Sequence, residues 1–271
     1  MFMAEIEKIN NDFVNLFREG RPLLENGCGK AMNVCREEAF RHFEALGGVP
    51  YKTEDYWYTD LSSVLGLDYK IVLKYIAQDV DLKEVFRCAV PDLLTNLILT
   101  VNGWYFKENA PIEIPEGVIV CGLQEAGVKY PHLLESHYNR YTPAAAKDGM
   151  IALNTAFAQD GLFVYIPKNT VVERPLQVVN LLRAKADLMA FQRNLIVVEA
   201  GAQATMLVCD HTLSDNRFLM NNTTEVYLGE GAHLDYYQVQ NQHLGASQIN
   251  SLLISEQRNS VFESNLVTLY G

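Results

Sequence analysis

The sequence predicts a mainly β protein with a helical N-terminal region, and three observations lead to this fold class. Apolar residues near the N-terminus recur every three or four positions, as they do on one face of a helix. From about Ile151 onward that period is lost, and short runs rich in Val, Leu, Thr and Tyr follow one another. A Gly-Ala pair at Gly201 returns at Gly231, 30 residues further along. A fixed repeat joining short strands is typical of the stacked coils of a solenoid.

Two helices are expected at the start of the chain. The apolar face of the first consists of Ile6, Ile9, Phe13, Leu16 and Phe17. This helix is expected to end at Gly20-Arg21-Pro22, since proline interrupts the hydrogen-bond ladder. The second helix runs from about Lys30 to Leu46 and ends at the Gly-Gly-Val-Pro of residues 47–50, because glycine suits the left-handed helix cap.

The middle of the chain mixes strand and helix signals. Leu97 to Val101 is a short β-type run, and Asn102-Gly103 after it is a strong signal for a two-residue hairpin turn. Residues 104–106 would form the returning strand. A further extended piece is expected over residues 112–121, and a helix over residues 124–139.

Short strands follow from there to the end of the sequence, most of them bounded by Gly, Asn, Asp or Ser. Pattern alone leaves two architectures open, a solenoid and an ordinary β-sandwich with two glycine turns. The expected strands are Leu162–Ile166, Leu176–Leu182, Leu195–Glu199, Ala204–Cys209, Thr224–Leu228, Leu234–Gln240, Ile249–Ser255 and Val261–Tyr270.

Charge and composition exclude several classes of protein. The chain has 22 Lys and Arg against 33 Asp and Glu, a formal charge of −11 with no basic stripe, so neither nucleic acid nor an anionic membrane is an expected partner. No apolar run is long enough to span a bilayer, and the N-terminus lacks the pattern of a signal peptide. A cytoplasmic protein is therefore expected. The five cysteines are widely spaced without a C-x-x-C motif, and in a reducing cytosol they should mostly be thiols.

A series of motifs in the second half of the chain resembles the SufB/SufD family of iron–sulfur cluster assembly proteins. They occur in the family's order, which makes the resemblance specific, whereas one alone would be weak. The motifs are Ala-Leu-Asn-Thr-Ala-Phe at 152–157, Asp-Gly at 160–161 with a strand ending in Pro-Lys at 167–168, Arg-Pro-Leu at 174–176, Arg-Asn-Leu-Ile-Val-Val-Glu at 193–199, Asn-Asn-Thr-Thr-Glu-Val at 221–226 and Glu-Gly-Ala-His-Leu at 230–234.

Residues 52–61 resemble a further motif of this family, but depart from it at Tyr56, where the family has Trp, and at Trp57, where it has a basic residue. Asn102-Gly103 and the Ile-Pro-Glu-Gly-Val of residues 114–118 also fit. The likeness runs from about Val49 to the last residue. The helical start and the lack of a metal motif make the chain most similar to the SufD branch.

The resemblance implies a right-handed parallel β-helix behind a helical N-terminal region, with residues 1–95 mainly helical and residues 96–271 forming the β-helix core. It also implies a scaffold without catalytic activity, which assembles with a SufB-type paralogue and a SufC-type ABC ATPase; a homodimer is a further possibility. No stably bound cofactor is implied, and an iron–sulfur cluster would be present only transiently in the full complex. Catalytic and cofactor-binding residues are therefore not predicted.

The chain stops at Gly271, directly after a strand, whereas members of this family are expected to continue through further coils and a helical C-terminal region. We therefore expect an incomplete β-helix that lacks the part binding the ATPase. An uncapped solenoid end exposes unpaired backbone, so another chain is expected to cover it.

One candidate site for a metal ion or for sulfur comes from the residues themselves. Cys209 and His211 are two positions apart, so in a strand they share a face, where a thiolate and an imidazole could hold iron or relay sulfur. The alternative is a buried cysteine packed within a coil, which is the commoner role of a free thiol. His233, Asp235 and Tyr237 alternate in the same way and are either a ligand set or a solvated strand face with Leu234 and Tyr236 inward.

Three other patterns have ordinary explanations. His132 and His137 are five apart, which suits surface residues better than a shared helical face. Gly27-Cys28-Gly29-Lys30 lacks the full phosphate-loop motif and is interpreted as a turn between helices. The aromatic residues Tyr51, Tyr56, Trp57 and Tyr58 either pack the helical region onto the solenoid, which we favour, or form a docking surface.

Two other functions remain open at this stage. A β-solenoid enzyme, such as an acyltransferase or a polysaccharide-acting protein, should show hexapeptide repeats or paired carboxylates on one rung, and neither pattern is visible. A sugar-binding β-domain should place exposed aromatic residues on one face of a rung.

Overall fold

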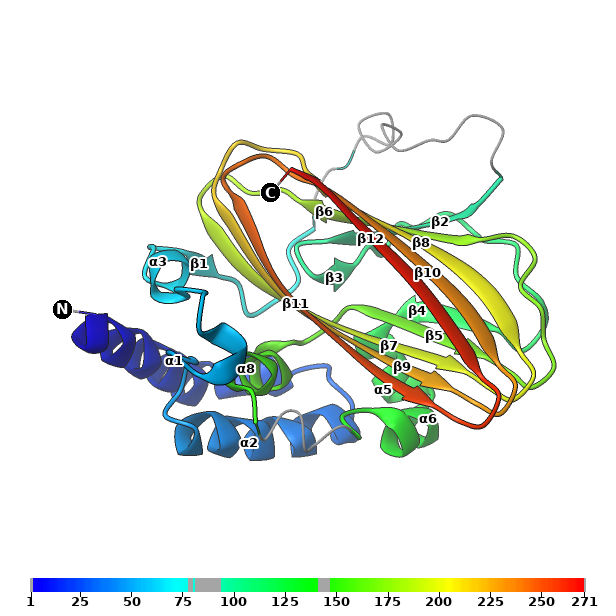
Figure 1. Cartoon of the computed structure of the whole chain (residues 1–271), viewed down its shortest axis with the longest axis horizontal. Coiled ribbons are helices and arrows are strands. Elements are labelled where there is room, and N and C mark those ends of the chain that lie inside the picture. Colours follow the sequence, from blue (N-terminus) through cyan, green and yellow to red (C-terminus); the bar gives the residue numbers. More distant parts are fainter. Residues whose placement is uncertain (1, 78–79, 81–93, 141–146, 271) are drawn as a thin grey trace.

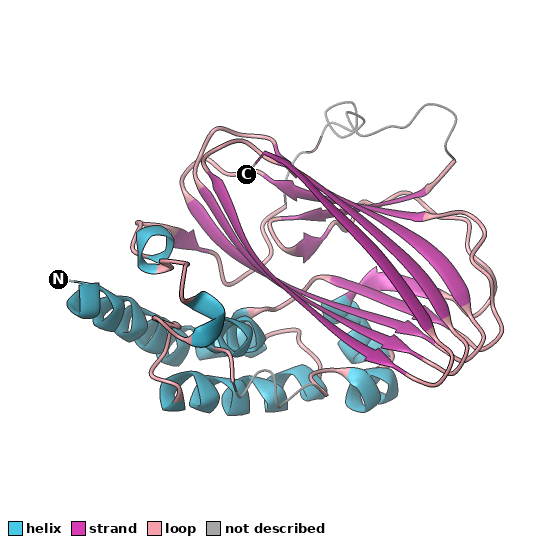
Figure 2. Ribbon diagram, viewed as in Figure 1, coloured by secondary structure: helices cyan, strands magenta, loops and turns pink. Residues whose placement is uncertain are grey.

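The computed structural model describes residues 2–77, 80, 94–140 and 147–270 (Figures 1 and 2). Helices and strands occur in the expected order, with the helices gathered beside one face of a long β-structure. The helices are α1 (Phe2–Glu25), α2 (Lys30–Ala45), a short 3-10 turn (Glu54–Tyr56), α3 (Ser62–Leu65), α5 (Leu123–Lys129), α6 (Pro131–His137) and α8 (Gly149–Phe157). The strands are β1 (Lys70–Ile71), β2 (Asn96–Val101), β3 (Trp104–Tyr105), β4 (Ile119–Gly122), β5 (Leu162–Ile166), β6 (Leu176–Leu182), β7 (Leu188–Val198), β8 (Gln203–Thr212), β9 (Phe218–Leu228), β10 (His233–Asn241), β11 (Ala246–Glu256) and β12 (Val261–Tyr270).

From β5 onward the chain alternates between two sheets, which is the arrangement of a solenoid. One sheet has the order β11-β9-β7-β5-β4 and the other the order β12-β10-β8-β6-β2-β3. Successive coils pair in parallel, with Leu188 opposite Phe218 and Ala204 opposite Leu234, in each case 30 residues further along the chain. The expected parallel β-helix is therefore confirmed, with about four turns, and the β-sandwich is excluded because the long strands pair in parallel.

The repeat visible in the sequence is the turn between the two sheets. Gly201 and Gly231 both have positive φ, 68° and 65°, and so do Asn169 at 58° and Asn259 at 57° in the corresponding turns. The turns stack through backbone hydrogen bonds, from Gly201 N–H to the Glu230 carbonyl and from Gly231 N–H to the Arg258 carbonyl. Because Asn also tolerates the left-handed conformation, four stacked turns look like two when only glycine is counted.

The inward residues of the two sheets form the solenoid's own core. Ile196, Val198 and Val226 of one sheet pack against Met206 and Leu234 of the other, all nearly inaccessible to solvent. The alternation of inward and outward residues along each strand accounts for this division.

The outward face of the sheet of β7 and β9 is covered by α1, α2 and α8 (Figure 1). Phe13, Phe17, Phe43 and Phe157 form a cluster of aromatic rings there, and Phe157 stacks on Phe191 of β7 at a centroid distance of 5.1 Å. The helical N-terminal region is thus fastened to the solenoid through an apolar interface. Burial of these large apolar side chains is the main stabilising contribution to such an interface.

The expected end of the first helix was wrong. α1 continues through Pro22 to Glu25, because Leu24 is fully buried and Arg21 forms ion pairs with Glu25 and Glu37. The glycine with positive φ after the helix is Gly27 instead of Gly20. The turn between α1 and α2 is confirmed at this point.

The expected loss of helical structure from Ile151 onward was wrong over α8. Asp148 caps this helix, since its Oδ1 accepts hydrogen bonds from the backbone N–H groups of Met150 and Ile151. All nine residues of α8 are buried, so the helix has no polar face and shows no amphipathic period. The helix expected over residues 124–139 is present as two short helices, α5 and α6, because Pro131 begins the second.

The hairpin at Asn102-Gly103 is confirmed. Both residues have positive φ, 52° and 83°, and β2 pairs with β3 in antiparallel register. Gly103 also lies directly against the solenoid, since a Cβ there would come within 2.5 Å of the Phe191 carbonyl oxygen. In the parts of the chain that the structure describes, no helix is long and apolar enough to cross a membrane.

The four described cysteines, Cys28, Cys35, Cys121 and Cys209, are free thiols, as expected. Cys88 lies outside the described residues. The division of the chain at residue 95 stays a prediction.

Candidate functional site

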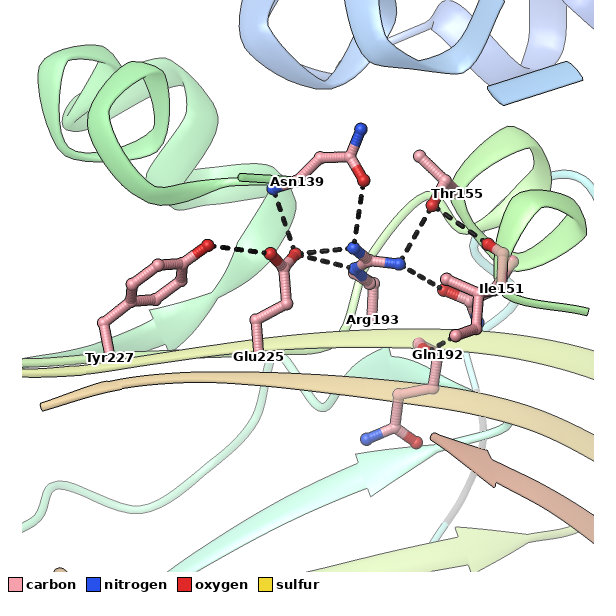
Figure 3. Close-up of polar contacts among 8 residues, drawn as sticks. Asn139, Ile151, Thr155, Gln192, Arg193, Glu225 and Tyr227 are labelled. Carbon is pink, nitrogen blue, oxygen red and sulfur yellow. Dashed lines mark hydrogen bonds and ion pairs between the residues drawn. The ribbon is translucent and has the colours of Figure 1, made fainter. Parts of the chain in front are cut away.

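An ion pair lies in the middle of the outward face of the sheet of β7 and β9, under the helices. Arg193 of β7 and Glu225 of β9 are both completely buried, and their Nη2 and Oε1 atoms are 2.6 Å apart. Arg193 Nε donates a second hydrogen bond to the same oxygen at 3.0 Å. Figure 3 shows the pair between the two strands and the helical region. Charges are rarely buried this deeply unless they are paired and hydrogen-bonded.

Residues from the helical region complete the hydrogen bonding of the guanidinium. Arg193 Nη1 donates to Thr155 Oγ1 of α8 at 2.9 Å, and Nη2 lies 3.4 Å from Asn139 Oδ1. The Tyr138 ring covers the guanidinium at 5.5 Å. The cation therefore binds α8 and the segment after α6 to the solenoid.

The carboxylate of Glu225 is satisfied in the same way. Its Oε1 accepts a hydrogen bond from the backbone N–H of Asn139 at 3.1 Å, and its Oε2 accepts one from the Tyr227 hydroxyl at 3.2 Å. Asn154 of α8 extends the network, because its side-chain amide donates to the backbone carbonyls of Gln192 and Asn221. We refer to Arg193, Glu225, Asn139, Asn154, Thr155 and Tyr227 as the polar clamp.

The electrostatics of the clamp favour the charged form of Arg193. Burial opposes the charge of Arg193, but the adjacent Glu225 carboxylate outweighs it, so the pKa of Arg193 is raised above its ordinary value. Burial raises the pKa of Tyr138 to about 12, which keeps this ring neutral. A guanidinium that is closed to solvent and holds its proton firmly is suited to fixing two parts of a fold together. It is not suited to exchanging protons with a substrate.

A second set of polar side chains, which we call the interior ladder, runs through the interior of the solenoid. On one sheet Asn194 donates to Asn222 at 3.1 Å, and Asn222 donates to Asn250 at 3.3 Å, one step per coil. On the other sheet Asn180 donates to Asp210 at 2.8 Å. Gln192 connects the two sheets through Asn180 at 3.1 Å.

Asp210 is the acidic member of this interior ladder. Burial raises its pKa, although hydrogen bonds from Gln238 and Asn180 oppose the shift. Because each polar group is satisfied by a neighbouring coil, the ladder sets the alignment of one coil on the next.

The polar residues of the clamp explain why two strands are longer than expected. β7 begins at Leu188 instead of Leu195, and β9 begins at Phe218 instead of Thr224. Gln192-Arg193-Asn194 and Asn221-Asn222-Thr223 interrupt the apolar pattern, so the expected strands began only after them. Their amide and guanidinium groups are buried with hydrogen-bond partners, whereas the buried Thr223 Oγ1 has none among the described residues.

Cys209 and His211 share the outward face of β8, as their spacing predicts. Cys209 is buried in an apolar cluster with Leu99, Val101 and Val179, and His211 Nδ1 lies 3.2 Å from the Asn241 carbonyl oxygen. Among the described residues, no group of three His, Cys, Asp or Glu side chains is arranged to hold a metal ion. A role for this pair in binding iron or relaying sulfur stays a prediction.

His233 and Asp235 are in contact on the outward face of β10, with Nε2 and Oδ1 2.9 Å apart, while Leu234 and Tyr236 point into the core. The alternation is therefore confirmed, and the side chains lie on a partly solvated face. His132 is exposed as expected, whereas His137 is half-buried and packs on the Tyr227 ring at 5.3 Å.

The aromatic segment divides into two parts. Tyr56 packs against the helical core, and its hydroxyl donates to Asp148 Oδ2 at 3.0 Å. Trp57 and Tyr58 point outward, with exposed fractions of 61% and 97%. The favoured packing interpretation therefore holds for Tyr56, while Trp57 and Tyr58 are free to meet another molecule.

Comparison with known protein families assigns the chain to one of them. The family model of the SufBD protein N-terminal region matches residues 7–178, and that of the SufBD core domain of the SUF iron–sulfur cluster assembly system matches residues 181–271. The chain belongs to the SufBD family. Among curated SufBD proteins, the iron–sulfur cluster assembly protein ABCI9 of Arabidopsis thaliana is 31% identical over 170 residues, covering 62% of this chain and 36% of the relative.

SufBD family proteins of staphylococci match over a longer range. A Staphylococcus aureus (strain MRSA252) protein is 25% identical over 250 residues, which is 86% of this chain and 53% of the relative. The chloroplastic ABCI8 of Arabidopsis thaliana is 36% identical over 133 residues, covering 49% of this chain and 24% of the relative. The chain thus spans from about a quarter to about half the length of these SufBD relatives.

The sequence motifs that resemble the SufBD family meet at the polar clamp. Asn154 and Thr155 come from the motif at 152–157, Arg193 from that at 193–199, and Glu225 from that at 221–226. The motifs therefore could have indicated the clamp, because each contributes polar side chains that the fold buries. These residues come together in space because of the coil length and the position of α8, which the motifs alone do not reveal.

Proposed function

We propose that this chain is a scaffold component of iron–sulfur cluster assembly, of the SufD branch, which assembles with a SufB-type paralogue and a SufC-type ABC ATPase in the cytoplasm and has no catalytic activity of its own. One observation carries the proposal. Asn154, Thr155, Arg193 and Glu225, which come from three of the family motifs, are sealed between the helices and the solenoid, where they hold the fold and are closed to a substrate.

An exposed aromatic surface supports a role in assembly. Trp57 and Tyr58 present two large aromatic side chains to solvent, and such residues are common at the centre of protein interfaces.

The proposal is tested by co-expressing the chain with the SufB-type and SufC-type proteins of the same organism. We expect the three to co-elute in size exclusion at a mass above that of any pair, and we expect deletion of the gene to lower the activity of iron–sulfur enzymes. Absence of any complex together with unchanged cluster-dependent activity would overturn the proposal. Variants Trp57→Ala and Tyr58→Ala serve as surface probes, with Lys8→Ala as the matched control on an exposed part of α1.

A further inference from the structure

A groove of about 800 Å³ lies where the helical region meets the solenoid, and none of the clamp residues lines it. Its walls come from the segment after β1, from the turn of the β2–β3 hairpin and from the loop between β6 and β7. The volume is within the range of pockets that hold small organic ligands.

The floor of the groove is apolar and belongs to the packed core. Phe157, Leu188 and Phe191 line it, together with Leu73 and Val101. Each of these residues is less than 10% exposed, so the floor is fixed in position by packing beneath it. A rigid apolar floor favours a ligand with an apolar body, because it removes that body from water.

The rim of the groove is basic. Lys70, Lys74, Arg183 and Lys185 line it, and none of the described lining residues is Asp or Glu. Lys70, Lys74 and Lys185 form no ion pair with any residue that the structure describes. Four cationic side chains around one groove contrast with the formal charge of −11 of the whole chain.

The wall that carries part of this rim is held in place by the hairpin. Asn102 accepts a hydrogen bond from the Arg183 backbone N–H at 2.9 Å and donates one to the Arg183 carbonyl at 2.7 Å. Trp104 follows on the same hairpin and packs edge-on against Tyr75. The cationic loop is thus positioned before any ligand arrives.

We propose that this groove binds a small amphipathic anion, with an aromatic or aliphatic body on the apolar floor and a phosphate, carboxylate or sulfonate group among the lysines. The charge of the rim selects the anionic end, and the depth of the floor selects the apolar body. The inference does not depend on the proposed function, since it rests on the groove alone.

The probe for the test is 8-anilinonaphthalene-1-sulfonate, an aromatic anion whose fluorescence rises on an apolar surface. The full chain carrying Trp57→Phe keeps Trp104 as its tryptophan, so energy transfer from Trp104 reports binding in the groove. We expect saturable binding at one site. The neutral N-phenyl-1-naphthylamine should bind more weakly, because it lacks the charge that the rim recognises.

Charge reversal separates the groove from nonspecific binding. Lys74→Glu with Lys185→Glu should raise the Kd of the probe about tenfold or more, whereas the matched double variant Lys8→Glu with Lys168→Glu, which changes the net charge equally, should change it less than about twofold. Ala186→Phe, which narrows the groove from the loop without adding a second tryptophan, should abolish energy transfer from Trp104. Near-UV circular dichroism on each variant confirms that the fold is intact.

Competition identifies the source of the anion. Displacement of the probe by AMP points to nucleotides, and displacement by dodecanoate points to acyl chains; either supports the proposal. Equal binding by the wild type and the Lys74→Glu/Lys185→Glu variant, or equal affinity for the charged and the neutral probe, would overturn it.

Discussion

Two ion pairs connect the same two coils of the solenoid. Their N–O distances are similar, but their side chains differ in how deeply they are buried. Arg193–Glu225 lies under the helices with both side chains completely buried, whereas Arg217–Asp187 lies at the other end of the same strands with side chains 47% and 24% exposed. The N–O distances are 2.6 Å and 2.5 Å. The N–O distance therefore does not indicate which pair contributes more to stability. The degree of burial does, because removing one partner of a buried pair leaves a charge that water cannot reach.

The largest expected effect is the loss of one partner of the sealed pair. Glu225→Gln leaves the Arg193 guanidinium buried without its counter-charge, and we expect the free energy of unfolding to fall by about 3–5 kcal/mol. Urea denaturation followed by circular dichroism measures this. The matched change at the open pair, Asp187→Asn, should leave the urea midpoint close to that of the wild type, since solvent takes the place of the lost contact.

The double replacement Arg193→Met with Glu225→Leu sharpens this comparison. Removing both charges leaves an apolar seam, so the variant should be more stable than Glu225→Gln alone. If Asp187→Asn destabilises the protein as much as Glu225→Gln, burial is not what separates the two pairs.

The same contrast between buried and open positions applies to two glycines of the solenoid. A Cβ on Gly161 would come within 2.0 Å of the Arg193 carbonyl oxygen, whereas a Cβ on Gly231, in an outer turn, would meet nothing within 4 Å. We expect Gly161→Ala to cost about 3 kcal/mol through overpacking and Gly231→Ala only about 1 kcal/mol through its positive φ. Thermal unfolding of the two variants checks the order, and a larger loss for Gly231→Ala would contradict it.

Two aspartates extend the comparison to pH. Burial raises the pKa of Asp160 to about 6, although its carboxylate accepts hydrogen bonds from the backbone N–H groups of Gln124 and Tyr105. The backbone N–H and the guanidinium of Arg217 lower the pKa of exposed Asp187. The folded state therefore holds the proton of Asp160 more tightly than the unfolded chain does, and it holds that of Asp187 less tightly.

The stability contributions of these two groups have opposite signs against pH. The contribution of Asp160 is greatest below pH 4 and falls by roughly 2–3 kcal/mol as the pH rises to about 6. That of Asp187 is present above pH 4 and is lost as the pH falls. Urea titrations at several pH values should show that Asp160→Asn removes the downward slope and that Asp187→Asn does not. A slope that persists in Asp160→Asn would assign it to another group.

The sequence indicated apolar strands and local turns better than buried polar segments. β5, β6, β12 and the Asn102-Gly103 hairpin were predicted at their true positions, because their apolar runs and turn residues follow local rules. α8 and the first halves of β7 and β9 were missed, because their residues are buried on all sides and carry no period. Most contacts of the clamp join residues 32 to 86 positions apart, which no local pattern contains.

The smallest expected effect lies within the aromatic segment, where sealed and open side chains are near neighbours. The Tyr56 hydroxyl donates to Asp148, whose other oxygen caps α8, whereas Tyr58 is 97% exposed. Tyr56→Phe should cost about 1 kcal/mol, the usual contribution of one hydrogen bond, and Tyr58→Phe should have no measurable effect on stability. Chemical denaturation resolves the difference. Equal stability of the two variants would mean that the hydrogen bond to Asp148 adds nothing to the cap, and that the helical region is held to the solenoid by its apolar contacts and the polar clamp alone.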